Sequence, residues 1–179
     1  MIWRIPATGG TPRPWFRSPR LAGLGGFGTT GIVHLPGSRS FLISQQTTAD
    51  PLDLARGHLY RLTVRADGRP GTLSTLWTSA PHDLPDGFGV ARSGAIVLAL
   101  LGSNQLVKLS PTGRVLARIR GTGSSVPFDS PSNATFLGTR VLVANQSAIL
   151  GTSSHHVVLD VEIGEPGAPI RVPARSTLR

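Results

Sequence analysis

Short runs in which apolar and polar residues alternate recur along the whole chain. Residues 2–5 (IWRI), 41–44 (FLIS) and 58–64 (HLYRLTV) are three of them. Each run is rich in β-branched, aromatic or leucine residues and ends at a cluster of turn residues, such as residues 66–69 (ADGR) and 110–114 (SPTGR). This pattern is typical of β-strands joined by tight turns. Because no segment has the apolar spacing of an amphipathic helix, the pattern predicts an all-β fold.

The strand signals repeat as a unit of four strands. The first two strands of the unit recur at 30–35 and 40–44, at 86–91 and 95–100, and at 132–137 and 140–145. Third strands are expected at 59–64, 105–109 and 157–161, and fourth strands at 73–78, 115–119 and 170–173. Four strands repeating every about 45–55 residues are typical of the blades of a β-propeller. The first two strands of each blade are expected nearest the axis and buried on both faces, which explains the apolar run at 95–101.

The repeat predicts one partial propeller domain over residues 1–179. We expect an outer half-blade and linker at 1–28, and blades at 29–80, 81–128 and 129–175. Closed propellers have about four to eight blades, so the ring is expected to be incomplete at its amino end. A gene fragment, a misplaced start codon and two half-rings joined in one assembly would each explain this. A half-ring exposes blade faces and a strand edge, so self-association through these edges is also expected.

Composition narrows the classes of function. With 39% hydrophobic and 15% charged residues the chain is not of the disordered type. The net charge of +9 raises nucleic acid as a partner, but the basic residues are scattered, and Lys108 is the only lysine, so no nucleic-acid partner is expected. Absence of cysteine excludes thiolate sites. No apolar run is long enough to predict a membrane span, and residues 1–10 lack the apolar core of a signal peptide; localisation stays open, cytoplasmic by default, or secreted if a preceding segment carries a signal.

The second and third blades carry a further resemblance. The segments 85–90 (PDGFGV), 95–99 (AIVLA) and 104–115 (NQLVKLSPTGRV) resemble a blade of the gluconolactonase family, which also contains senescence marker protein (regucalcin) and luciferin-regenerating enzyme. Residues 128–145 are similar to a blade of bacterial members, and residues 159–167 (LDVEIGEPG) to their closing segment. The resemblance extends over roughly residues 1–173, but other six-bladed propellers share much of this pattern of turns and strands.

The resemblance implies a six-bladed propeller with a calcium or zinc ion on its axis. In this family a Glu, an Asn and an Asp hold the ion, which polarises a lactone carbonyl while the Asp helps to activate water. Asp86 matches that Asp, whereas Thr30 stands at the position of the Asn, and the first-blade Glu falls outside the matched part. The resemblance therefore predicts a metal-dependent lactone hydrolase with Asp86 as catalytic residue and metal ligand, and Thr30 as a weaker ligand. The alternative is a non-enzymatic propeller that binds a small molecule or a protein, with Asp86 as an ordinary turn residue.

Several other residues have two possible interpretations, one as part of a functional site and one as an ordinary structural position. His82 with Asp83, and His155 with His156, are neighbours whose side chains diverge on a strand, so polar loop positions are favoured and one of the two later histidines is expected to be exposed. The tryptophans, at positions 3, 15 and 77, are expected to pack rather than stack on a ligand. Polar residues end each second strand and either face a ligand or bond the chain locally: Ser44, Gln45, Gln46, Ser103, Asn104, Asn145 and Gln146.

Overall fold

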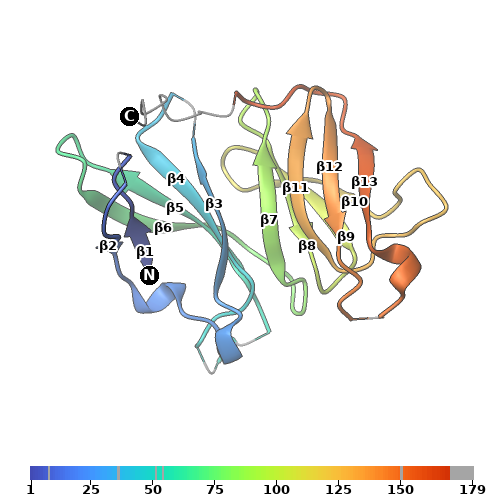
Figure 1. The fold of residues 1–179 in the computed structure, drawn as a ribbon, viewed down its shortest axis with the longest axis horizontal. Coiled ribbons are helices and arrows are strands. Elements are labelled where there is room, and N and C mark those ends of the chain that lie inside the picture. The colour runs from blue at the N-terminus through green and yellow to red at the C-terminus, as the bar shows by residue number, and fades with distance from the viewer. Residues whose placement is uncertain (8, 36, 51, 54, 150, 170–179) are drawn as a thin grey trace.

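The computed structural model describes residues 1–169 except 8, 36, 51, 54 and 150. Over this part of the chain the regular structure is β-strand, with three short 3₁₀ turns and no α-helix (Figure 1). The strands form four antiparallel sheets. The all-β propeller fold predicted from the repeat is confirmed.

The first blade is a four-stranded meander. It consists of β3 (Thr29–His34), β4 (Ser40–Gln45), β5 (His58–Val64) and β6 (Pro70–Thr78), hydrogen-bonded in that order. Tight turns containing Gly68 at positive φ and the Asp67 side chain join β5 to β6. The strands expected at 59–64 and 73–78 are therefore present, the latter as part of a longer strand.

The second blade has the same order of strands. It consists of β7 (Pro85–Val90), β8 (Ile96–Leu100), β9 (Gln105–Leu109) and β10 (Val115–Ile119). Every residue of β8 is buried, as expected for an apolar run that packs on both faces. One core cluster joins this blade to the first through Leu42, Leu59, Phe88 and Leu98, and so holds the two sheets face to face.

The third blade shows three strands: β11 (Pro131–Leu137), β12 (Arg140–Asn145) and β13 (Val157–Glu162). The strand expected at 170–173 lies outside the described residues. A second core cluster, which includes Val97, Leu106, Phe128, Val141 and Leu159, joins the second and third blades.

The first strands of the three blades lie side by side. β7 contacts β3 on one side and β11 on the other (Figure 1). Their burial differs from the expectation that the first strand of each blade is buried on both faces. β7 is mostly buried because it has an inner strand on each side, whereas β3 and β11 have a described neighbour on one side and are largely half-exposed or exposed. Ile32 on β3 and Leu137 on β11 are 50% and 61% exposed.

The amino-terminal segment forms a two-stranded hairpin of β1 (Ile2–Arg4) and β2 (Arg13–Phe16), followed by η1 (Pro19–Leu21) and η2 (Leu24–Gly26). The hairpin packs through Trp15 and Phe16 on the outer part of the first blade. Trp3 is 52% exposed, so the expectation that all three tryptophans pack in the protein is wrong for this one. Trp3 lies on a hairpin that only one sheet covers.

After β13 the chain returns across the second blade. Residues 163–169, here called the return segment, bond to the end of β7 and the turn after it: Arg92 N donates to Pro166 O at 2.8 Å, and Ala168 N donates to Val90 O at 2.8 Å. Lys108 Nζ of β9 and Glu165 Oε1 form an ion pair at 2.6 Å with both side chains about four-fifths buried. The return segment therefore fastens the third blade to the second.

Candidate functional site

Asp86 is the second residue of β7 and lies where the first and second blades meet. Gln46, which follows β4 and is 6% exposed, donates a hydrogen bond from Nε2 to Asp86 Oδ2 at 2.9 Å. The side chains of Asp86 and Phe88, two positions apart on β7, point to the same face of the strand. The Phe88 ring lies against Gly31 of the first blade. The carboxyl group is thus held at one end of the inner strands, between two blades.

Thr30 lies beside Asp86 on the neighbouring inner strand. Its hydroxyl is 3.1 Å from the Ser44 hydroxyl and 3.5 Å from the carbonyl of Pro85, the residue before Asp86. Ser44 is fully buried and accepts a hydrogen bond from Gly31 N at 2.8 Å. Thr30 and Asp86, the two residues singled out in the sequence as site residues, are therefore brought to one place.

The environment of Asp86 changes its acidity. Burial raises the pKa of Asp86 from 3.8 to about 6, because the ionised form loses hydration. Hydrogen bonds from the side chains of Thr30 and Gln46 and from the Gly87 backbone favour the ionised form and oppose part of that rise in pKa. A carboxylate with this pKa is ionised at neutral pH and is a stronger base than an ordinary aspartate.

The third blade contacts β7 at Gly87, the residue after Asp86, through Asn133. A Cβ atom added at Gly87 would overlap the Asn133 side-chain oxygen and would lie 2.8 Å from the Ser132 carbonyl oxygen. Asn133 is exposed, and its Nδ2 donates to Thr135 Oγ1 at 3.1 Å. Sequence reasoning did not single out Asn133. Its position in the repeat could have revealed it, because Asn133 aligns with Gly31 and Gly87. The third blade therefore carries an amide side chain where the other two blades have none.

The site residues offer few ligands for a metal ion. Asp86 supplies one carboxylate, Thr30 a hydroxyl and Gln46 an amide oxygen. Among the described residues no three His, Asp or Glu side chains come together as a metal site. Calcium takes about six to eight oxygen ligands and zinc about four ligands, with carboxylates or histidines prominent in both sets. The described residues alone therefore do not fit a resident divalent cation.

The polar residues at the ends of the second strands divide into two groups. Gln45 Nε2 donates to the carbonyls of Arg20 and Ala22, and Asn145 Nδ2 donates to those of Pro127 and His155. These two amides hold the chain as it enters a blade, which is the local hydrogen-bonding interpretation. Gln46 belongs to the second group, because its side chain contacts the candidate base.

The two His-containing pairs differ from each other. His82 is exposed, whereas the neighbouring Asp83 is 3% exposed, pairs with Arg118 at 3.1 Å and accepts a hydrogen bond from Ala80 N. Asp83 therefore stabilises its loop. His156 is exposed, which confirms that one of the two later histidines faces solvent.

His155 belongs to a cluster that the sequence did not reveal. The Asp129 carboxylate is fully buried; Ser147 Oγ donates to its Oδ2 at 2.6 Å, and His155 Nδ1 lies 2.9 Å from the same oxygen. Burial by itself would raise the pKa of Asp129, but these hydrogen bonds and the charges of His155 and His156 outweigh it and hold the pKa below its ordinary value. Since the Ser147 hydroxyl donates to the carboxylate, it is not arranged as a nucleophile, and the cluster stabilises the loops that flank β11 and β13.

With blades of this order and inner strands packed side by side, the chain is a part of a β-propeller. Solved structures of the same fold include a gluconolactonase from Xanthomonas campestris (TM-score 0.55, 22% identity, 80% of this chain and 40% of that one). They also include the calcium-binding protein regucalcin from Agrobacterium tumefaciens (TM-score 0.56, 18% identity, 78% and 46%). A luciferin-regenerating enzyme is a third (TM-score 0.55, 13% identity, 79% and 47%). The chain spans less than half the length of each of these proteins.

These comparisons confirm the propeller fold that the resemblance implied, and the solved structures bear the names of the same three proteins. At this level of identity they establish fold alone. No family model matches the chain, and its sequence matches no curated protein. In the described part of the chain no helix is long and apolar enough to cross a membrane.

Proposed function

We propose that the chain is the catalytic part of a lactone hydrolase of the gluconolactonase type, with Asp86 as the general base. The observation that carries the proposal is the position of the Asp86 carboxyl group. It is half-buried between two blades at the end of the inner strands, with its pKa raised to about 6 and one oxygen held by Gln46. A base with a pKa near the working pH is the most effective in proton transfer.

The reaction follows from that arrangement. The Asp86 carboxylate accepts a proton from a water molecule as the water oxygen bonds to the lactone carbonyl carbon. The ring C–O bond of the resulting tetrahedral species then breaks, and the departing alkoxide oxygen takes the proton from Asp86. The products are a hydroxy acid and the regenerated carboxylate. Gln46 keeps one carboxylate oxygen in place so that the other faces the water.

One of the solved structures with this fold is named as a gluconolactonase, and that name supports a lactone as the substrate class. The described residues do not form a complete site for calcium or zinc, so the proposed reaction uses Asp86 and water alone.

Hydrolysis of glucono-1,5-lactone in a pH-stat, with and without added calcium or zinc, tests the proposal. We expect a rate above that of buffer that rises through pH about 6, and a loss of about 100-fold or more in Asp86→Asn, the usual effect of removing a general base. Asp67→Asn is the matched control because Asp67 is an exposed turn residue. Equal rates in the two variants would exclude Asp86 as the base.

A second candidate function is a propeller that binds a small molecule without turnover. Thr30 and the lack of a second acidic side chain in the described site favour it. In that case the lactone raises the melting temperature of the chain, while wild type and Asp86→Asn both leave hydrolysis at the rate of buffer. Turnover that depends on Asp86 would rule this candidate out.

A further inference from the structure

A pocket of about 290 Å³ lies between the first and second blades, away from Asp86. It is lined where β3 and β7 end, by residues such as Leu35, Val90 and Ala91, whereas Asp86 is near the start of β7. Val90 is four positions after Asp86, which corresponds to about 13 Å along an extended strand. The pocket is therefore distinct from the candidate active site, and both sheets that form it are described.

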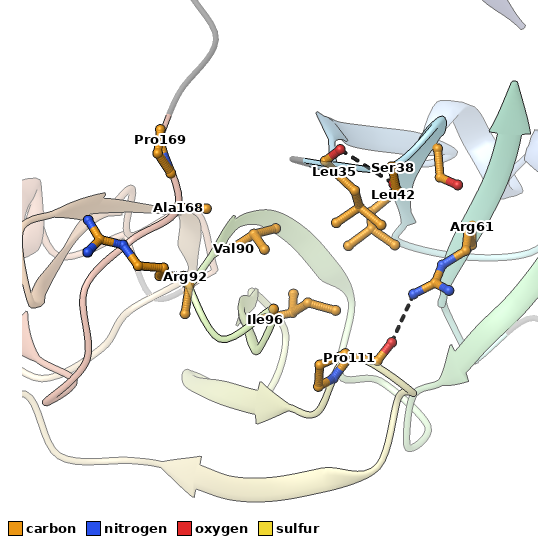
Figure 2. Close-up of a pocket in the computed structure, with 13 residues that line it drawn as sticks. Leu35, Ser38, Leu42, Arg61, Val90, Arg92, Ile96, Pro111, Ala168 and Pro169 are labelled. Carbon is orange, nitrogen blue, oxygen red and sulfur yellow. Dashed lines mark hydrogen bonds between the residues drawn. The ribbon is translucent and has the colours of Figure 1, made fainter.

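The floor of the pocket is apolar. Figure 2 shows Leu35 and Leu42 of the first blade facing Val90 and Ile96 of the second. Leu42 and Ile96 are buried and belong to the core cluster that joins the two blades. Ala168 of the return segment lies near Val90, which its backbone contacts. Such a floor suits the hydrocarbon part of a small ligand.

Arg61 of β5 forms one rim of this apolar floor. Its Nη2 donates to the carbonyl oxygen of Pro111, in the turn between β9 and β10, at 2.9 Å (Figure 2). Its Nε atom is buried and has no hydrogen-bond partner in the described part of the chain. The Arg61 side chain lines the pocket, and an ionised acceptor that binds to a guanidinium group forms charge-assisted hydrogen bonds, which are stronger than neutral ones.

The charge around the pocket is positive. Arg92 lies at the opposite rim, with its exposed guanidinium group turned away from the apolar side chains (Figure 2). No acidic residue lines the pocket, and Glu165 on the return segment is bonded to Lys108 and Ser93. The residues outside the described part include no Asp or Glu, so none of their side chains supplies a carboxylate to Arg61 or Arg92.

We propose that this inter-blade pocket binds a small organic carboxylate with an apolar body. The carboxylate accepts hydrogen bonds from Arg61, and the hydrocarbon part lies on Leu42, Val90 and Ile96. Arg92 adds attraction from the other rim. Because the ligand contacts both blades, its binding stabilises their association. The site is independent of the proposed lactone hydrolysis at Asp86, so either can fail without the other.

Titration of the full chain with hexanoate, followed by calorimetry and by the melting temperature, tests the proposal. Hexanol has the same hydrocarbon chain without the charge, and inorganic phosphate has charge without the chain. We expect hexanoate to bind and to raise the melting temperature, and hexanol and phosphate to bind at least about tenfold more weakly, the factor that a charge-assisted hydrogen bond typically contributes.

Three variants locate the site. Arg61→Gln is expected to weaken hexanoate binding by about tenfold or more, and Arg92→Gln by about threefold, since its charge acts from the rim. Arg65→Gln removes the same charge at an exposed position outside the pocket and is expected to leave affinity unchanged. Should Arg61→Gln fail to fold, the three ligands and Arg92→Gln decide the matter.

Each contrary result overturns the proposal. Equal binding of hexanol would show an apolar cavity only. Equal binding of phosphate would show a bare anion site. Equal weakening by Arg65→Gln would show attraction to the net charge of the chain rather than to this pocket, and no binding of hexanoate at all would remove the site.

Discussion

Gln46 donates a hydrogen bond from Nε2 to Asp86 Oδ2 at 2.9 Å, and these two residues, forty positions apart in the sequence, join the first blade to the second. The contact fixes one carboxyl oxygen and favours its ionised form. The same bond thus links the two blades and opposes part of the rise in the pKa of Asp86 that burial causes.

Gln46→Leu is expected to raise the pKa of Asp86 above about 6, because the substitution removes a hydrogen bond to the carboxylate and keeps the site apolar. The carboxyl carbon of Asp86, followed by NMR as a function of pH, measures the pKa. Gln146→Leu serves as a control, since Gln146 is the exposed residue at the corresponding end of β12. An unchanged or lowered pKa in Gln46→Leu would contradict the role given to this bond.

Asp86→Asn is expected to stabilise the fold at pH 8 by about 1 kcal/mol, a value reduced for partial exposure of the group. The pKa of Asp86 is higher in the folded chain than in the unfolded chain, so the folded state binds the proton more readily. Its contribution to stability is present below pH about 4 and is lost as pH rises to about 6. Urea unfolding at pH 4 and pH 8 measures this, with Asp67→Asn as control. A gain of equal size at both pH values would show that ionisation is not its cause.

Asp129→Ala is expected to cost about 2–3 kcal/mol in the free energy of unfolding at pH 7, because Ser147 and His155 lose a buried acceptor. The pKa of Asp129 is lowered on folding, so its contribution is present above pH about 4 and is lost as pH falls through the lowered pKa. The cost should therefore be smaller at pH 3 than at pH 7 in urea unfolding. Asp160→Ala, at an exposed ion pair with Arg140, should cost less than about 1 kcal/mol. A cost for Asp129→Ala as small as that of the control would mean that the cluster adds no stability.

Gly57→Ala is expected to destabilise the chain by about 1–3 kcal/mol through overpacking. A Cβ atom at Gly57 would overlap the carbonyl oxygens of Gln45 and Gln46 and the ring of Pro85. Gly121 has open space around its Cβ position and no positive φ, so Gly121→Ala should be neutral or slightly stabilising. Melting temperatures of the two variants test this. A similar melting temperature for both would show that the blades have room to separate at Gly57.

The exposed apolar side chains on the first strands predict self-association. Ile32 and Leu137 are each at least half exposed on strands that flank β7. We expect the purified chain to form dimers or larger species, and Leu137→Lys to reduce their fraction, as measured by light scattering behind size exclusion. Val158→Lys is the control, since Val158 is exposed to a similar degree on β13, away from the inner strands. A monomeric wild-type chain would end this prediction.

The position and order of the strands could be predicted from the sequence, because a strand depends on the local alternation of apolar and polar residues and a turn depends on its own few residues. The strands expected at 105–109 and 115–119 coincide with β9 and β10. Contacts between residues far apart in the sequence could not be predicted in this way. Asp129 meets Ser147 and His155 from eighteen and twenty-six positions away, and no periodicity marks such a pairing.

The candidate site shows the same division. Asp86 and Thr30 were singled out by the resemblance to the gluconolactonase family, at matching positions of two blades. Gln46 was one of seven polar residues at strand ends, and only the packing of the first blade on the second distinguishes it from Gln45, its neighbour that bonds the chain locally. The exposure of Trp3 likewise depends on how many sheets cover the amino-terminal hairpin.

The return segment has a consequence for how the molecule opens. In a linear array of repeats each unit can unfold when its neighbour's interface is lost. Here the segment after β13 is anchored on the second blade by Glu165 with Lys108 and by the backbone of Val90 and Arg92. The third blade therefore cannot separate from the second while these contacts of the return segment are intact. The amide protons of the third blade and those of β7 should therefore exchange with solvent in one common opening event. The return segment, and not the inner strands alone, makes the two blades unfold cooperatively.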